Sequence, residues 1–305
     1  MAISASFNFR FPQESARSPF LKSQLCSPVQ WPPKETNLEG KVAIVTGSSS
    51  GLGLEASRQV ISFSLSTLIM AVRSTAKGEA VASKFRRQFP KADVQVWSLE
   101  MKSYGSIQAF ARRVNDELSR LDIAILSAGM QISNFAVVPY GTRDIDPGPG
   151  RLTIINSGTA RGATIPKPKG GPVLSALDKS RPWDPVERYA ISKLLAHLFL
   201  IDLLRYVSAD DVVVNLADPG MVKNTDLQRG APLLVAAFFY SFKAVLGRTL
   251  PVGASTISMQ RWSKGRIRMV ATWLTGEAAR EQVWQETMAE FQFAGSQEIL
   301  AGLKR

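Results

Sequence analysis

The chain has 305 residues, 45% of them apolar, and carries a formal net charge of +12 with a sequence pI near 10.0. Its one cysteine, Cys26, excludes an internal disulfide, and its one histidine, His197, excludes a metal site built from several histidines. The basic excess is compatible with anionic small molecules, a membrane surface or a solvated face, but no basic-aromatic run indicates nucleic acid, which we do not expect as a partner.

The chain divides into an arm and one large domain. Residues 1–38 are rich in Ser, Pro and Phe and form an N-terminal arm, either ordered or loose. Residues 39–305 suit a single α/β domain, with 226–295 as a substrate lobe. We expect a cytoplasmic protein, because cysteine is nearly absent and no apolar run reaches transmembrane length.

The most apolar stretch is residues 231–247, "APLLVAAFFYSFKAVLG", which carries Lys243. Three interpretations stay open for it. It is a buried helix, a lid over the substrate, or a helix that lies on a membrane surface in weak peripheral contact.

Apolar, β-rich runs alternate with amphipathic helical runs from Lys41 onward. A last amphipathic helix is expected around Val283 to Phe291. This alternation predicts a doubly wound, parallel, Rossmann-like α/β sheet. The expected strands are 41–47, 66–72, 92–99, 121–129, 151–158 and 211–220, and the expected helices between them are 52–61, 75–89, 106–118 and 186–207.

A glycine-rich loop, "TGSSSGLG" from Thr46 to Gly53, follows the first strand and opens the first helix. Glycines let the backbone approach a pyrophosphate closely, and a helix N-terminus offers free N–H groups and the positive end of its dipole. An ordinary Gly/Ser turn is the alternative. The strand-turn-helix context favours a dinucleotide site.

Arg73 ends the second strand, at the place where an acidic residue would hold a ribose 2′-hydroxyl. An arginine suits a 2′-phosphate instead, which predicts NADP rather than NAD as the cofactor. A surface arginine without this role is the alternative.

Tyr189 and Lys193 lie four residues apart in "YAISK", on one face of the expected helix. An ammonium near a phenol favours the phenolate, so we expect a lowered pKa for Tyr189 and proton exchange with a substrate oxygen. Ser157, after the fifth strand, could hydrogen-bond that oxygen. A helix with an incidental Tyr and Lys is the alternative, and we interpret His197 as a packed histidine rather than a proton carrier.

Taken in order, "TGSSSGLG", "SAG", "INSG", "YAISK" and "ADPGMVKNT" resemble the motifs of the short-chain dehydrogenase/reductase family. The resemblance covers roughly residues 38–225. "RPWDPVERYAISKLLA" is most similar to fungal members, many of which serve secondary-metabolite pathways. The resemblance implies an NADP-dependent oxidoreductase that interconverts a carbonyl and an alcohol on a small molecule.

The resemblance also implies roles at matched positions. Tyr189 would be the acid/base, Lys193 would tune its pKa and contact the ribose, and Ser157 would donate to the substrate oxygen. Ser127 replaces an Asn that usually braces the central strands. The full set of expected cofactor contacts is Gly47, Ser49, Gly51, Leu52, Arg73, Glu100, Ala128, Gly129, Tyr189, Lys193, Pro219, Gly220, Val222 and Thr225.

Residues 130–150 depart from the family. Parallel strands need a crossover, usually a helix, but this segment is dense in proline and glycine and has no helical apolar period. The family's helix here carries a catalytic Asn and packs at the usual dimer interface. We therefore expect the crossover helix between the fourth and fifth strands to be missing, the dimer interface to be disturbed, and Leu194, Leu198 and Ile201 to be exposed.

Three hypotheses about function follow. The first is an active NADP-dependent oxidoreductase. The second is a catalytically impaired or inactive relic of the same family. The third is a membrane-surface or partner-binding protein that uses its basic charge and residues 231–247.

Overall fold

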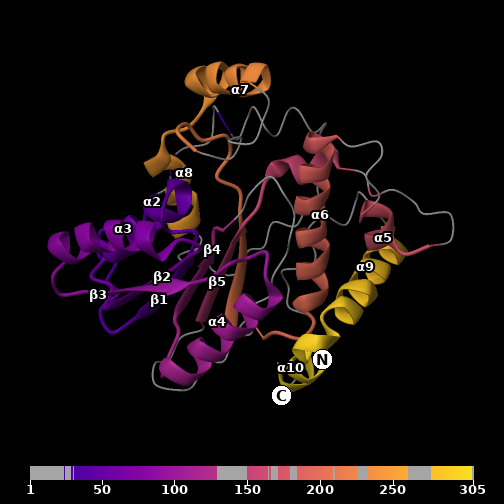
Figure 1. The fold of residues 1–305 in the computed structure, drawn as a ribbon, viewed down its shortest axis with the longest axis horizontal. Coiled ribbons are helices and arrows are strands. Elements are labelled where there is room, and N and C mark those ends of the chain that lie inside the picture. Colours follow the sequence, from indigo (N-terminus) through magenta and orange to yellow (C-terminus); the bar gives the residue numbers. More distant parts are fainter. Residues whose placement is uncertain are drawn as a thin grey trace.

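The computed structural model describes residues 24, 29, 31–128, 150–163, 165, 171–178, 184–208, 210–225, 233–259 and 276–303. Within these ranges the predicted α/β architecture is confirmed (Figure 1). The predicted absence of a crossover helix concerns residues 130–150, nearly all of which lie outside the described ranges; of these only Gly150 is described, as the first residue of the fifth strand.

A single parallel sheet of six strands runs through the molecule in the order β3-β2-β1-β4-β5-β6. The strand order reverses between β1 and β4, and in sheets of this kind ligands bind outside the carboxyl ends of the strands at such a point. The strands are β1 (Val42–Thr46), β2 (Thr67–Val72), β3 (Asp93–Ser98), β4 (Ile123–Leu126), β5 (Gly150–Ile155) and β6 (Val212–Ala217).

Helices cover both faces of the sheet, and their apolar residues form the core on each side (Figure 1). Alternate residues of β1 point to opposite faces: Ala43 and Val45 join the cluster under α2, α3 and α8, and Ile44 joins the one under α4. The helices are α2 (Gly51–Ile61), α3 (Thr75–Gln88), α4 (Tyr104–Glu117), α5 (Val173–Asp178), α6 (Pro185–Leu203), α7 (Leu233–Leu246), α8 (Leu250–Met259), α9 (Gly276–Glu290) and α10 (Ser296–Leu303), with 3-10 turns η3 (Gly158–Gly162) and η6 (Gln292–Ala294).

Helix α6 begins where its sequence provides a strong start signal. The Asp184 carboxylate accepts hydrogen bonds from the backbone N–H groups of Val186 at 2.8 Å and Glu187 at 3.2 Å, and Pro185 occupies the first turn. Such a cap satisfies N–H groups that would otherwise lack partners, and proline is pre-organised for this position. The start of α6 fixes where Tyr189 and Lys193 fall along the sheet.

The predicted exposure of α6 is wrong. Leu194, Leu198 and Ile201 are 0%, 1% and 5% exposed. They pack in one cluster with residues of η3, of α5 (Val173) and of α9 (Val283). Segments on both sides of α6 in the sequence thus cover the helix face that the sequence left without an obvious partner, and Leu194, Leu198 and Ile201 form no exposed apolar patch.

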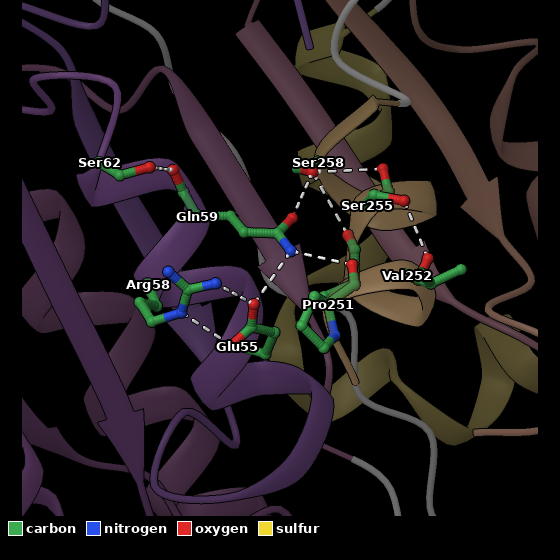
Figure 2. Close-up of polar contacts among 9 residues, drawn as sticks. Glu55, Arg58, Gln59, Ser62, Pro251, Val252, Ser255 and Ser258 are labelled. Atoms are coloured by element: carbon green, nitrogen blue, oxygen red, sulfur yellow. Dashed lines mark hydrogen bonds and ion pairs between the residues drawn. The ribbon is translucent and has the colours of Figure 1, made fainter. Parts of the chain in front are cut away.

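A buried polar contact joins the glycine-loop helix α2 to α8. Gln59 of α2 donates from Nε2 to the carbonyl oxygen of Pro251 at 3.0 Å, and its Oε1 accepts from Ser258 Oγ of α8 at 2.8 Å (Figure 2). Nε2 also lies 3.1 Å from Glu55 Oε1. Because buried polar groups are costly unless paired, this set fixes α8 against α2.

The predicted helix within residues 231–247 is confirmed as α7, which lies away from the sheet (Figure 1). Tyr240 and Val245 are exposed large apolar residues, so a wholly buried helix is excluded. No helix among the described residues is long and apolar enough to cross a membrane.

Candidate active site

The described site residues gather at the carboxyl ends of the strands. The glycine turn follows β1, Arg73 follows β2, Glu100 follows β3, Ala128 follows β4, and Ser157 follows β5. Residues 218–225 follow β6, and Lys193 of α6 donates from Nζ to the carbonyl oxygen of Ile155, the last residue of β5, at 3.3 Å. Gly129 lies outside the described residues.

The glycine turn has a left-handed backbone that residues with a side chain adopt rarely. Gly47 and Gly51 have φ values of +67° and +56°. A Cβ on Gly47 would lie 2.9 Å from Ala128 Cα, and one on Gly53 would lie 2.5 Å from the Gly47 carbonyl oxygen. Close approach of neighbouring backbone therefore favours glycine at positions 47 and 53, whereas at position 51 the positive φ alone does.

The start of α2 leaves hydrogen-bond capacity for a ligand. Ser50 makes no side-chain cap there, whereas Ser74, Ser103 and Asp184 cap α3, α4 and α6. The hydroxyl of buried Ser48 in the same turn has no hydrogen-bond partner among the described residues. A turn with this backbone, followed by an uncapped helix N-terminus, fits a diphosphate.

Arg73, which follows β2, and Glu100, which follows β3, lie close to each other. Arg73 Nε is 4.0 Å from Glu100 Oε2, and both side chains are more than a third exposed. The guanidinium is therefore held loosely beyond the end of β2, where solvent or an anion can reach it.

Ser157, Tyr189 and Lys193 form the predicted cluster at the β5 end. The Lys193 Nζ lies 5.5 Å from the centre of the Tyr189 ring. Burial raises the pKa of Tyr189 above the ordinary phenol value, while a hydrogen bond with Ser157 lowers it and the charge of Asp218 raises it further. The predicted lowering of the Tyr189 pKa is therefore wrong, because desolvation outweighs the other influences.

Burial also acts on Lys193. It lowers the pKa of the ammonium, and the negative charge of Asp218 partly opposes that shift.

Asp218 is a site residue that the sequence reasoning missed. Its two carboxylate oxygens accept from the backbone N–H groups of Gly158 and Gly220, both at 2.9 Å. It thereby ties the turn beside Ser157 to the turn after β6, and a Cβ on Gly158 would lie 2.8 Å from its Oδ2. The signal in the sequence that could have identified Asp218 is a carboxylate directly before "PG" at the end of a strand.

Asn156 was missed as well. Its Nδ2 donates to the backbone carbonyl oxygen of Lys193 at 3.1 Å and lies 3.0 Å from Nδ1 of His197. His197 Nδ1 lies 2.9 Å from the same carbonyl oxygen, and burial lowers the pKa of this imidazole. These contacts bind the end of β5 to the turn of α6 that carries Lys193, with His197 as a packed residue.

The turn after β6 contains the remaining predicted cofactor contacts, Pro219, Gly220, Val222 and Thr225. Gly220 has φ +71°. Val222 is buried against Gly253 of α8, and Thr225 Oγ1 accepts from Lys243 Nζ at 3.1 Å. A further hydrogen bond links the ends of β1 and β4. The Ala128 N–H donates to Thr46 Oγ1 at 2.9 Å, next to Ser127, which stands where the family usually has an Asn.

Comparisons with known proteins agree with this geometry. Residues 41–139 match the family model described as short chain dehydrogenase. A relative from Annulohypoxylon moriforme, short chain dehydrogenase/reductase mfmJ, is 41% identical over 93% of this chain and 94% of the relative. Short chain dehydrogenase opdN from Penicillium oxalicum is 39% identical over 79% of this chain and 88% of the relative. The chain belongs to the short-chain dehydrogenase/reductase family of nicotinamide-dependent oxidoreductases.

Solved structures share the fold. A short chain dehydrogenase from Shigella flexneri has a TM-score of 0.52 at 16% identity, covering 78% of this chain and 91% of that one. L-sorbose reductase from Gluconobacter frateurii, complexed with NADPH and L-sorbose, has a TM-score of 0.50 at 16% identity, covering 79% and 95%.

The alignment with the Annulohypoxylon relative runs over 324 positions, more than the 305 residues of this chain. That relative therefore carries residues with no counterpart here.

Proposed function

We propose that this chain is an NADP-dependent oxidoreductase that interconverts a carbonyl and an alcohol on a small organic substrate. The observation that carries the proposal is the convergence of Ser157, Tyr189 and Lys193 at the carboxyl end of β5, on the sheet edge that also holds the glycine turn. A proton donor and a hydride source must meet at one carbon–oxygen bond for this reaction. This edge holds the proton donor and the turn that would bind the cofactor, which would supply the hydride.

The cofactor fits the residues of the glycine turn. The turn from Gly47 to Gly53 and the N-terminus of α2 would hold the diphosphate, and Arg73 would hold a 2′-phosphate, which supports NADP over NAD. Binding of a 2′-phosphate would draw Arg73 from its loose contact with Glu100. When bound, the reduced nicotinamide supplies a hydride.

The protein's own residues supply the proton. The raised pKa of Tyr189 keeps its phenol protonated at neutral pH, so the phenol can donate to a carbonyl oxygen. Ser157 would donate a hydrogen bond to the same oxygen and hold it in line with Tyr189. The phenol is therefore able to donate a proton at neutral pH. The fungal sources of the relatives support a substrate from secondary metabolism.

The hypothesis of an inactive relic has lost one of its physical grounds. It expected an uncovered face on α6, and that face is buried by η3, α5 and α9. The cluster of Ser157, Tyr189 and Lys193 is intact in the part of the chain that the structure describes. We therefore propose the active enzyme as the function.

Replacement of Tyr189 by Phe tests this proposal. NADPH consumption would be followed at 340 nm with a panel of ketones and an ortho-quinone as a reactive carbonyl probe. We expect Tyr189→Phe to lower turnover by about 100-fold or more, as loss of a general acid does, with little change in the Kd of NADPH. The control is Tyr104→Phe, on the exposed side of α4. Turnover by Tyr189→Phe at the wild-type rate would remove the proposed role.

A further inference from the structure

Gln24 of the N-terminal arm reaches the turn that follows β6. Its Nε2 donates to the carbonyl oxygens of Met221 at 2.9 Å and Leu246 at 2.8 Å, and its Oε1 accepts from the Met221 N–H at 3.1 Å. The side chain is only 8% exposed. Gln24 thus precedes the first strand in the sequence, yet it packs against the turn after β6 and the end of α7.

The contact uses both N–H donors of the glutamine amide and one lone pair of its oxygen. Both N–H groups of Nε2 have a carbonyl partner, and Oε1 has a backbone donor. The amide pairs with both backbone groups of Met221, as one peptide pairs with another in a sheet. A glutamate of the same size would lack the two donors and would set a carboxylate against two carbonyl oxygens.

The turn is shaped to receive this amide. A Cβ on Gly220 would lie 2.5 Å from Gln24 Oε1, so the glycine at φ +71° is what lets the glutamine approach. The Met221 carbonyl oxygen also accepts from the Arg248 N–H at 2.8 Å, so it uses both lone pairs.

Gln24 completes a set of ties around the turn 218–221. From the side of the sheet, Asp218 binds the turn to Gly158, the residue after Ser157. Gln24 in turn bridges Met221 and Leu246, the last residue of α7, through its two N–H groups. The position of this turn, and of the end of α7 with respect to it, thus depends on a side chain that lies before residue 41, where the match to the family model begins.

We propose that Gln24 is a positioning residue for the nicotinamide end of the site. Gln24 fixes the turn 218–221 in the conformation that receives the cofactor. This inference rests on the proposed function, because the turn matters for catalysis only if a nicotinamide cofactor binds beside it. Gln24 itself touches no reacting atom.

Four full-length proteins test the inference: the wild type, Gln24→Ala, Gln24→Glu and the control Gln88→Ala. Gln88 is an exposed glutamine at the end of α3. The Kd of NADPH would be measured by fluorescence titration, the melting temperature by calorimetry, and the deuterium uptake of residues 217–225 by mass spectrometry.

We expect both Gln24 variants to bind NADPH about tenfold more weakly, as the loss of about one net hydrogen bond would give, and to take up deuterium faster across 217–225. Gln88→Ala should match the wild type. Gln24→Glu distinguishes a hydrogen-bonding role of Gln24 from a space-filling role, because a side chain that only fills space would tolerate the change to glutamate. The affinity loss should exceed any loss in kcat at saturating NADPH.

Wild-type affinity for NADPH in Gln24→Glu would overturn the inference, and so would unchanged uptake across 217–225 in both variants. If the wild type itself binds no NADPH, the proposed function fails. In that case the uptake measurement still decides whether Gln24 holds the turn: faster uptake in the variants supports the tie, and equal uptake refutes it.

Discussion

Replacement of Leu194 by Ala tests whether α6 is covered. Leu194 of α6 is 0% exposed and lies in one apolar cluster with residues of η3, α5 and α9. The substitution removes three carbon groups from the core, worth about 2 kcal/mol as transfer free energy at roughly 0.8 kcal/mol each, and leaves a cavity. Together these give a loss of about 3 kcal/mol in the free energy of unfolding. With an unfolding entropy of about 0.6 kcal/mol/K for 305 residues, the melting temperature should fall by about 5 °C.

Differential scanning calorimetry measures this shift, with chemical denaturation as a second readout. Val186→Ala is the matched control, because Val186 lies on the same helix and is 56% exposed. That variant should stay within about 0.5 kcal/mol of the wild type. A Leu194→Ala protein with an unchanged melting temperature would show that this face of α6 is uncovered in solution, and the packing described above would be wrong.

Three further predictions concern charge. Arg73→Asp should weaken NADPH binding much more than NADH binding, and equal losses in a fluorescence titration would refute the 2′-phosphate role. The buried imidazole of His197 has a pKa below its unfolded value, so its contribution to the free energy of unfolding is complete above about pH 6.5 and is lost as pH falls through the folded pKa. Denaturant titrations at pH 5 and pH 8 should show this loss in the wild type, and His197→Gln should reduce it. Asp218→Asn removes a charge that raises the pKa of Lys193, so the alkaline limb of the pH–rate profile should move to lower pH. An alkaline limb at the same pH as in the wild type would show that the charge of Asp218 does not act on the site.

The sheet and the site edge could be predicted from the sequence because their signals are local. Short apolar runs such as 66–72 alternate with amphipathic ones, and each expected strand within the described residues overlaps an observed one. In a parallel sheet, residues that directly follow strands meet at one edge, so Arg73, Ser157 and Gly220 could be placed together before any coordinates.

Long-range packing could not be predicted in the same way. The cover on α6 comes from α5 and α9, and Val283 of α9 lies far from Leu194 in sequence. The pKa of Tyr189 depends on how deeply the phenol is buried, which the spacing of Tyr189 and Lys193 does not reveal.

The polar ties of the site are equally non-local. Gln24 meets Met221 across 197 positions of the chain, and Asp218 meets Gly158 across 60. A pattern within a short window carries no information about such pairs.

The most direct test of the central claim is a fluorescence titration of the purified chain with NADPH and, in parallel, with NADH. The site described here predicts saturable binding of NADPH in the micromolar range and clearly weaker binding of NADH. A folded, monodisperse sample that binds neither cofactor would contradict the assignment of the glycine turn and Arg73, and with it the proposed oxidoreductase.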